Sequence, residues 1–323
     1  MRPKASVPAS AEATDPPSPR HALVALALMG VLVLYAAAQL VPRLPDRPPR
    51  LEDIGGTLDC RQRPRFAAAA GFETGSALST GEGAQPGLVL VDATAPERSY
   101  QHPSWARHGF LGPLTYDAEG NVYVAPMPNI SLLENPPEEQ NSIYRVDTES
   151  GEMDLFLQLP PGGPLKAENP FGILGLTYDC DTGSLYASSV AGSTRSQEFG
   201  RILRIDPADA TVTDSMSEVD AMGLAVFRGS RDRRLYFGSA RRPELWSIAL
   251  DDDGAFLGSA RRELQLPGWS DKARRIIFDA EGGMEVLGVP FVFNLALGVD
   301  DPENAYGFRY DPMIDTWRIE TMP

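Results

Sequence analysis

The chain has 323 residues, of which 42% are hydrophobic and 23% are charged, and its formal net charge is −15. So acidic a chain repels a phosphate backbone, which excludes nucleic-acid binding driven by phosphate attraction. The two cysteines are too few for a disulfide-dense miniprotein. A polytopic membrane protein is excluded as well, because a single run is long and apolar enough to cross a bilayer.

The N-terminal part of the chain is predicted to anchor it in a membrane. Residues 1–21 are rich in Ala, Pro and Ser, which is typical of a disordered tail. Residues 22–41 carry no charge and would span roughly 30 Å as a helix, so we predict a transmembrane signal anchor. The alternative is a signal peptide cleaved near Ala36–Ala38, although such signals usually have a shorter apolar core. Residues 42–59 then form a Pro-rich linker.

The orientation of this anchor is predicted from the lengths of its flanks. Basic residues are equally frequent on both sides of the helix, so the positive-inside rule does not decide. A short tail precedes the helix and a large domain follows it, which favours an orientation with the N-terminus on the cytoplasmic side of the membrane. We therefore expect a single-pass protein whose main domain lies outside the cytoplasm, in the bacterial periplasm.

Residues 60–323 contain a repeated pattern of four short apolar runs. The first turn of a unit is rich in Asp and Gly (DAEGN, DCDTG or DAEGG), which suits a tight hairpin, and a second Asp-rich turn follows. Four antiparallel strands repeated at roughly 45–60 residues are typical of β-propeller blades. The legible units lie within 114–159, 176–216, 224–260 and 275–322.

The pattern predicts an all-β fold, a five- or six-bladed β-propeller behind a single N-terminal transmembrane helix. Residues 60–103 are interpreted as a degraded first unit, with Phe66–Phe72 and 87–93 as strands. A β-sandwich is the alternative, but it would not repeat the same turns in every unit. Ring closure, which removes exposed strand edges, requires the N-terminal segment to pair with the first or last blade.

The segments GPLTYDAEGNVYV and GLTYDCDTGSLYA resemble the propellers of the regucalcin/gluconolactonase, strictosidine-synthase-like and NHL-repeat families. The resemblance covers most of residues 111–322 and implies the propeller fold. In the gluconolactonase group it implies a divalent metal such as Ca²⁺. Asp220 in VDAMGL would then be a metal ligand and the catalytic base, and Asn169 in ENPFGILGL a second ligand. The family's Glu has no counterpart in WARHGFLGPL, where His108 lies nearby.

These two residues also have a plain structural interpretation, because Asp and Asn often cap turns at the starts of strands. The geometry of a blade places the connection between its second and third strands on the same face as the connection between blades. We call this face the long-loop face, and the opposite one the hairpin face. Asn169, Asp220 and Asp271 all lie on inter-blade connections, so they belong to the long-loop face, where binding sites are expected.

A second group of candidate ligand-binding residues on the same face is mostly basic. It comprises Arg241, Arg242, Lys272 and Arg274, with Asp271. Arg side chains suit carboxylate or phosphate groups, so the group indicates a small anionic ligand. The alternative is that these side chains form solvated ion pairs with neighbouring carboxylates.

The two cysteines, Cys60 and Cys180, are either paired or buried as free thiols. A disulfide between them would suit an exported domain and would fix the membrane-proximal segment to the hairpin face. That arrangement would leave the long-loop face free.

The sequence therefore indicates a membrane-anchored extracytoplasmic β-propeller that acts as a binding or scaffold module. Its partners would be the membrane, through residues 22–41, and an envelope protein or a small anionic ligand. The alternative is a metal-dependent gluconolactonase-like or strictosidine-synthase-like hydrolase acting on a small organic substrate. The sequence motifs of nucleophile-elbow hydrolases, zinc proteases, P-loop proteins and dinucleotide-binding enzymes are absent.

Overall fold

The computed structural model describes residues 54–72, 75–80, 85–128, 134–294 and 303–320. They belong to one compact unit, Pro49–Pro323. The predicted tail, the predicted anchor and the linker up to residue 53 lie outside the described residues. Within the described ranges, no helix has the length and apolar character needed to cross a membrane.

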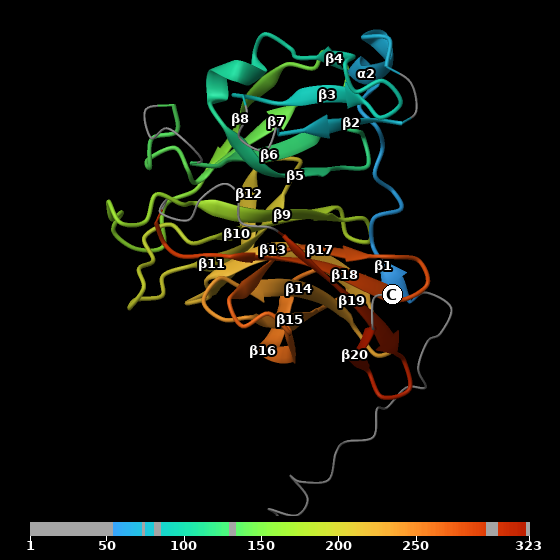
Figure 1. Cartoon of the computed structure of the whole chain (residues 1–323), viewed down its shortest axis with the longest axis vertical. Helices are drawn as coiled ribbons and strands as arrows, with labels where there is room; N and C mark the ends of the chain where they lie inside the picture. Colours follow the sequence, from blue (N-terminus) through green and yellow to red (C-terminus); the bar gives the residue numbers. More distant parts are fainter. Residues whose placement is uncertain (1–53, 73–74, 81–84, 129–133, 295–302, 321–323) are drawn as a thin grey trace, which may run out of the picture. The chain divides into compact units, whose positions relative to one another are not determined.

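The described strands form five antiparallel sheets, the blades of a five-bladed β-propeller (Figure 1). Blade 1 contains β2 (Ser76–Ser79), β3 (Val89–Asp92) and β4 (Ser99–Tyr100). Blade 2 contains β5 (Leu111–Tyr116), β6 (Val122–Pro126), β7 (Ser142–Val146) and β8 (Met153–Gln158). Blade 3 contains β9 (Ile173–Asp179), β10 (Ser184–Ser189), β11 (Arg201–Asp206) and β12 (Thr211–Ser217).

Blade 4 contains β13 (Ala221–Arg228), β14 (Arg233–Ser239), β15 (Glu244–Leu250) and β16 (Phe256–Gln265), and the short strand β1 (Gly55–Gly56) joins it. Blade 5 contains β17 (Asp271–Phe278), β18 (Gly283–Pro290), β19 (Asn304–Asp311) and β20 (Thr316–Glu320). The four legible sequence units are thus confirmed as four-stranded blades. A five-bladed propeller is confirmed, and the described residues contain no sixth sheet.

Part of the prediction for the degraded first unit is wrong. The predicted strand Phe66–Phe72 is replaced by helix α2 (Arg65–Ala69), whose sequence RFAAA continues into a further alanine. Alanine has the highest helix propensity, and this run lacks the alternation of a half-buried strand. The second predicted strand of the unit is present as β3. A short 3-10 helix, η2 (Trp105–His108), precedes blade 2.

The Asp-rich turns predicted from the repeats are stabilised by their own carboxylates. In the first hairpin of blade 2, Asp117 Oδ1 accepts hydrogen bonds from the backbone N–H groups of Glu119 and Asn121. In the first hairpin of blade 5, Asp279 Oδ1 accepts hydrogen bonds from Glu281 and Gly283 in the same way. In these two turns the recurring Asp therefore stabilises the closed turn.

The hydrophobic core is divided into layers between successive blades. Four clusters of buried side chains join blades 1 and 2, 2 and 3, 3 and 4, and 4 and 5. Each sheet thus buries apolar side chains against the next sheet along the chain. Among the described residues, no equivalent cluster joins blade 5 to blade 1, so closure of the ring does not rest on a fifth apolar layer.

The N-terminal segment crosses the hairpin face and contacts several blades. We call residues 54–64 the strap; it connects β1 to α2 in Figure 1. At its start, β1 pairs with β13 of blade 4, and Gly56 packs against Phe278 of blade 5. The expected pairing of the N-terminal segment with the first or last blade is therefore wrong for β1. A two-residue strand is enough to fix the strap beside the inner strand of blade 4.

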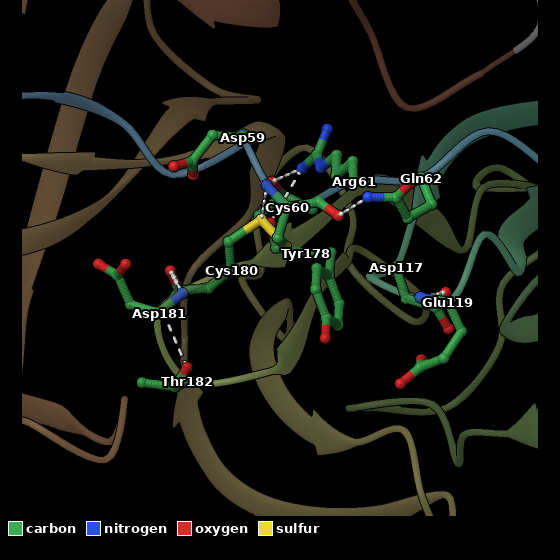
Figure 2. Close-up of a disulfide and its surroundings, with 12 residues drawn as sticks. Asp59, Cys60, Arg61, Gln62, Asp117, Glu119, Tyr178, Cys180, Asp181 and Thr182 are labelled. Atoms are coloured by element: carbon green, nitrogen blue, oxygen red, sulfur yellow. Dashed lines mark hydrogen bonds between the residues drawn. A yellow bond between two sulfur atoms is a disulfide. The ribbon is translucent and has the colours of Figure 1, made fainter.

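The middle of the strap is bound covalently to blade 3. Cys60 and Cys180 form a disulfide with Cα atoms 5.6 Å apart, across a sequence separation of 120 residues (Figure 2). The backbone N–H of Cys180 donates to the carbonyl of Thr57, and Arg61 donates to the carbonyl of Tyr178. The strap is therefore held against the first hairpin of blade 3 by one disulfide and these two hydrogen bonds.

The end of the strap binds blades 2 and 1. The backbone N–H of Gln62 donates to the carbonyl of Asp117 in blade 2, and the Arg63 guanidinium donates to Ser76 in blade 1. Gly120 has a positive φ of 89°, and a Cβ at this position would lie 2.9 Å from the carbonyl oxygen of Arg63. The glycine of the DAEGN turn thus serves both the turn and the close approach of the strap.

We expect the double substitution Cys60→Ser/Cys180→Ser to lower the free energy of unfolding by about 4–5 kcal/mol, because it releases a closed loop of 120 residues. Chemical denaturation followed by tryptophan fluorescence measures this change. Reduction of the unmutated chain should give the same loss. Equal denaturation midpoints with and without the disulfide would show that the remaining strap contacts are sufficient.

Candidate functional site

Three predicted site residues, Asn169, Asp220 and Asp271, occupy equivalent places in the repeat. Each lies just before or at the start of the inner strand of its blade, and each is almost fully buried, with 1–2% of its surface exposed. Burial of a polar side chain is costly unless it is hydrogen-bonded, so the partners of these residues indicate their role.

Asn169 connects the entry of blade 3 to the loop between its second and third strands. Its Nδ2 donates to the carbonyls of Val190 at 2.8 Å and Ser193 at 2.9 Å. Its Oδ1 accepts from the backbone N–H of Phe171 at 3.0 Å. Both ends of the amide are therefore used within blade 3.

Asp220 is the centre of a buried ion pair at the start of blade 4. Its Oδ2 lies 2.5 Å from Nη2 of Arg241 and 2.6 Å from Nε of the same guanidinium. Its Oδ1 accepts from the Ser193 hydroxyl and from the Gly200 N–H. Burial raises the pKa of Asp220, although the hydrogen bond from Ser193 and the charge of Arg241 oppose this effect. Both carboxylate oxygens already have donors.

The Arg241 guanidinium has several further partners within the protein. Besides Asp220, it donates to the carbonyls of Thr194, Arg195 and Gln197. Its Cζ lies 5.1 Å from the centre of the Phe293 ring, a cation–π distance. Arg241 therefore fixes the long loop of blade 3 to blade 4.

Asp271 performs the equivalent task in blade 5. Its Oδ2 accepts from Nδ2 of Asn304 at 2.8 Å and from the hydroxyl of Tyr306 at 2.5 Å. Burial, together with this carboxylate, raises the pKa of Tyr306 to about 12. Asn169, Asp220 and Asp271 thus form one repeated structural device that ties the entry of a blade to its later segments.

The structure brings the two predicted metal ligands close without forming a metal site from them. They meet through Ser193, whose carbonyl accepts from Asn169 and whose hydroxyl donates to Asp220. Ca²⁺ requires six to eight oxygen ligands. Throughout the ranges that the structure describes, no group of three or more His, Cys, Asp or Glu side chains is arranged to hold a metal ion.

The sequence analysis missed an apolar cluster at the long-loop end of the inner strands. Its buried members are Leu174, Val190, Met222, Ala240 and Phe293, and its half-buried members are Met127, Phe171, Val289 and Phe291. The ring centres of Phe171 and Phe291 are 5.1 Å apart, although they belong to blades 3 and 5. The aromatic run FVF at 291–293, in a long connection where polar residues are expected, was the signal for this cluster.

The remaining basic residues of the predicted group differ in their partners. Arg274 forms an exposed ion pair with Glu303 at 2.8 Å, as the ion-pair interpretation expects. Arg242 is exposed, and within the described region its side chain forms no ion pair. Lys272 is buried, with 7% of its surface exposed, and its Nζ donates to the carbonyl of Ser270 at 2.9 Å. Burial lowers the pKa of Lys272, opposed by the charge of Asp271.

Comparisons with known proteins concern the fold. Neither protein-family models nor curated proteins match the chain. Among solved structures, a calcium-binding regucalcin from Agrobacterium tumefaciens is 15% identical, with a TM-score of 0.44 over 82% of this chain and 77% of that chain. A glucose dehydrogenase is 16% identical, with a TM-score of 0.42 over 71% and 78%. A Bacteroides caccae protein of unknown function is 10% identical, with a TM-score of 0.40 over 66% and 65%.

We expect Asp220→Asn to lower the free energy of unfolding by roughly 3 kcal/mol, the lower end of the cost of breaking a buried ion pair. The lower end applies because the Arg241 side chain is 20% exposed and keeps its carbonyl partners. The matched control is Glu303→Gln, which removes an exposed pair and should cost less than about 1 kcal/mol. Denaturant titration compares the two variants, and equal costs would contradict a structural role for Asp220.

His108, on the connection into blade 2, should make stability depend on pH. Its ring centre lies 4.2 Å from that of Tyr144, and burial lowers its pKa below the ordinary 6.5. The folded chain therefore holds this proton less tightly than the unfolded chain, so stability falls as the pH drops through and below about 6.5. His108→Gln should flatten the curve of unfolding free energy between about pH 7 and pH 5. A curve unchanged by the substitution would assign the acid sensitivity elsewhere.

Proposed function

We propose that this protein is a membrane-anchored extracytoplasmic binding module whose ligand surface is the long-loop face of the propeller. The observation that carries the proposal is the half-buried part of the apolar cluster, Met127, Phe171, Val289 and Phe291. These side chains come from three blades, and a rigid scaffold holds them. Apolar and aromatic side chains gathered on such a scaffold are the usual lining of ligand sites.

The position of the strap supports this choice of face. The strap runs along the hairpin face and is bonded to the blades there. The long-loop face is therefore free of the strap.

The disulfide supports an extracytoplasmic location. Thiols in the cytosol are kept reduced, whereas disulfides persist in the periplasm and outside the cell. The two cysteines of this chain are both used in the bond between the strap and blade 3. The same bond stabilises the segment that follows the proposed anchor and linker.

The hydrolase alternative has less support. A catalytic carboxylate needs an oxygen within reach of substrate or metal. The Asp220 side chain is 0% exposed, and its oxygens accept from Ser193, Gly200 and Arg241. Release of Asp220 for catalysis would require Arg241 to give up its ion pair and leave a buried charge unpaired.

The location is tested by fractionating cells that express the full chain. We expect the intact chain in the membrane fraction, and we expect added protease to degrade the propeller domain in spheroplasts but not in whole cells. A chain that is shortened by removal of residues 1–38 and released in soluble form would favour the cleaved signal peptide. Protection of the domain in spheroplasts would overturn the extracytoplasmic location.

The choice between binding module and metal-dependent hydrolase is tested by calorimetric titration of the chain with Ca²⁺. We expect no saturable binding by the unmutated chain or by Asp220→Ala. Saturable binding that disappears in Asp220→Ala would instead support the hydrolase and justify a screen of lactones and esters. The control is Arg274→Met, which changes an exposed residue of the same face and should give the same titration as the unmutated chain.

A further inference from the structure

The last blade has two different faces. One face packs against blade 4 through buried side chains that include Ile276, Phe278 and Val286. The strand register places Lys272 opposite Val289, and Arg275 opposite Leu287. Side chains alternate along a strand, and residues directly opposite one another share a face. These two pairs therefore lie on the face of blade 5 that is turned away from blade 4.

This second face also carries apolar side chains. We call Ile277, Leu287, Val289 and Phe291 the apolar strip; all four are half-buried. Val289 and Phe291 pack against the apolar cluster of the long-loop face. Ile277 and Leu287 belong to none of the core clusters that the described residues form. The strip thus extends from the proposed ligand surface along β18.

Two basic residues beside the strip, Lys272 and Arg275, form no ion pair in the described region, and the exposed Glu285 lies on the same face, opposite Ile277. Lys272 is 7% exposed, and the carbonyl of Ser270 is its one hydrogen-bond acceptor among the described residues. Arg275 is exposed and, over the same ranges, forms no ion pair. The neighbouring carboxylate of Asp271 accepts from Asn304 and Tyr306 instead. In a chain with a net charge of −15, two unpaired basic groups beside an apolar strip indicate an anionic partner.

We propose that the apolar strip binds a small molecule with an acyl or similar apolar chain and a carboxylate, and that Lys272 pairs with the carboxylate. This inference rests on the proposed binding role of the long-loop face and names the chemistry of its ligand. The carboxylate of the ligand would serve as the counter-ion of the buried Lys272 ammonium group. The acyl chain of the ligand would cover the half-buried side chains of the strip. Leu287 and Val289 lie roughly 7 Å apart along β18, and Phe291 follows the end of this strand.

The first test measures binding of radiolabelled octanoate to the full chain in nanodiscs, with the signal of empty discs subtracted. We expect saturable binding that weakens about tenfold in Lys272→Met, because a charge-assisted hydrogen bond is lost. Lys166→Met is the matched control, since Lys166 is an exposed lysine on a connection of the same face, and it should change binding less than about twofold. Equal affinity of Lys272→Met and the unmutated chain would overturn the proposal.

The second test uses the unmutated chain and so does not depend on a variant that folds. An amine-reactive acetylating reagent is applied with and without octanoate, and the modification of Lys272 and Lys166 is quantified by mass spectrometry. We expect octanoate to slow the modification of Lys272 several-fold and to leave Lys166 unchanged, while octanol protects neither. No protection of Lys272, or equal protection of both lysines, would overturn the proposal.

A third variant, Leu287→Asp, tests the apolar part of the site. It introduces a carboxylate into the strip beside Arg275, and we expect it to reduce octanoate binding at least tenfold. Unchanged binding would show that the acyl chain lies elsewhere. Failure of octanoate to bind in all three tests removes this ligand class, whereas the fractionation and the Ca²⁺ titration decide the proposed function separately, because neither involves the strip.

Discussion

The covalent connection between the strap and blade 3 is the constraint on which the arrangement of this propeller depends. A segment that forms only a two-residue strand crosses the hairpin face and is held there by Cys60–Cys180 and by backbone hydrogen bonds. Four apolar layers join the successive blades, and the strap adds contacts that reach from blade 5 to blade 1. Because the strap occupies the hairpin face, the long-loop face is the one on which side chains are available to bind a ligand.

The repeated architecture separates structural from functional polar residues. A polar residue that recurs at the same place in several blades has a structural role that these blades share. Asn169, Asp220 and Asp271 fit this description, since each is buried and hydrogen-bonded to its own blade or, for Asp220, also to the preceding one. Residues that depart from the repeat are better candidates for binding. Lys272, a buried ammonium beside apolar side chains, is such a departure.

Blade 5 differs from the other blades, because no core cluster of the described residues joins its second face to blade 1. Blade 5 buries one face against blade 4, while its other face combines the apolar strip with basic side chains. Val289 on this face packs against the apolar cluster, whereas Leu287 belongs to no core cluster of the described residues, and a ligand at the strip would cover it. The proposed acyl carboxylate would satisfy both the apolar and the charged part of this surface.

The sequence by itself determined the strands, the Asp-closed turns and the number of legible blades, because these depend on alternation and turn chemistry within a few residues. The same local evidence misassigned Phe66–Phe72, where an apolar run without alternation became a helix. Only the tertiary structure decided that β1 pairs with β13, that Arg241 is consumed by Asp220 and three carbonyls, and that Lys272 has no acidic partner. Those outcomes depend on contacts between residues far apart in the chain, or on the absence of such a contact in the described region, and no local pattern encodes either.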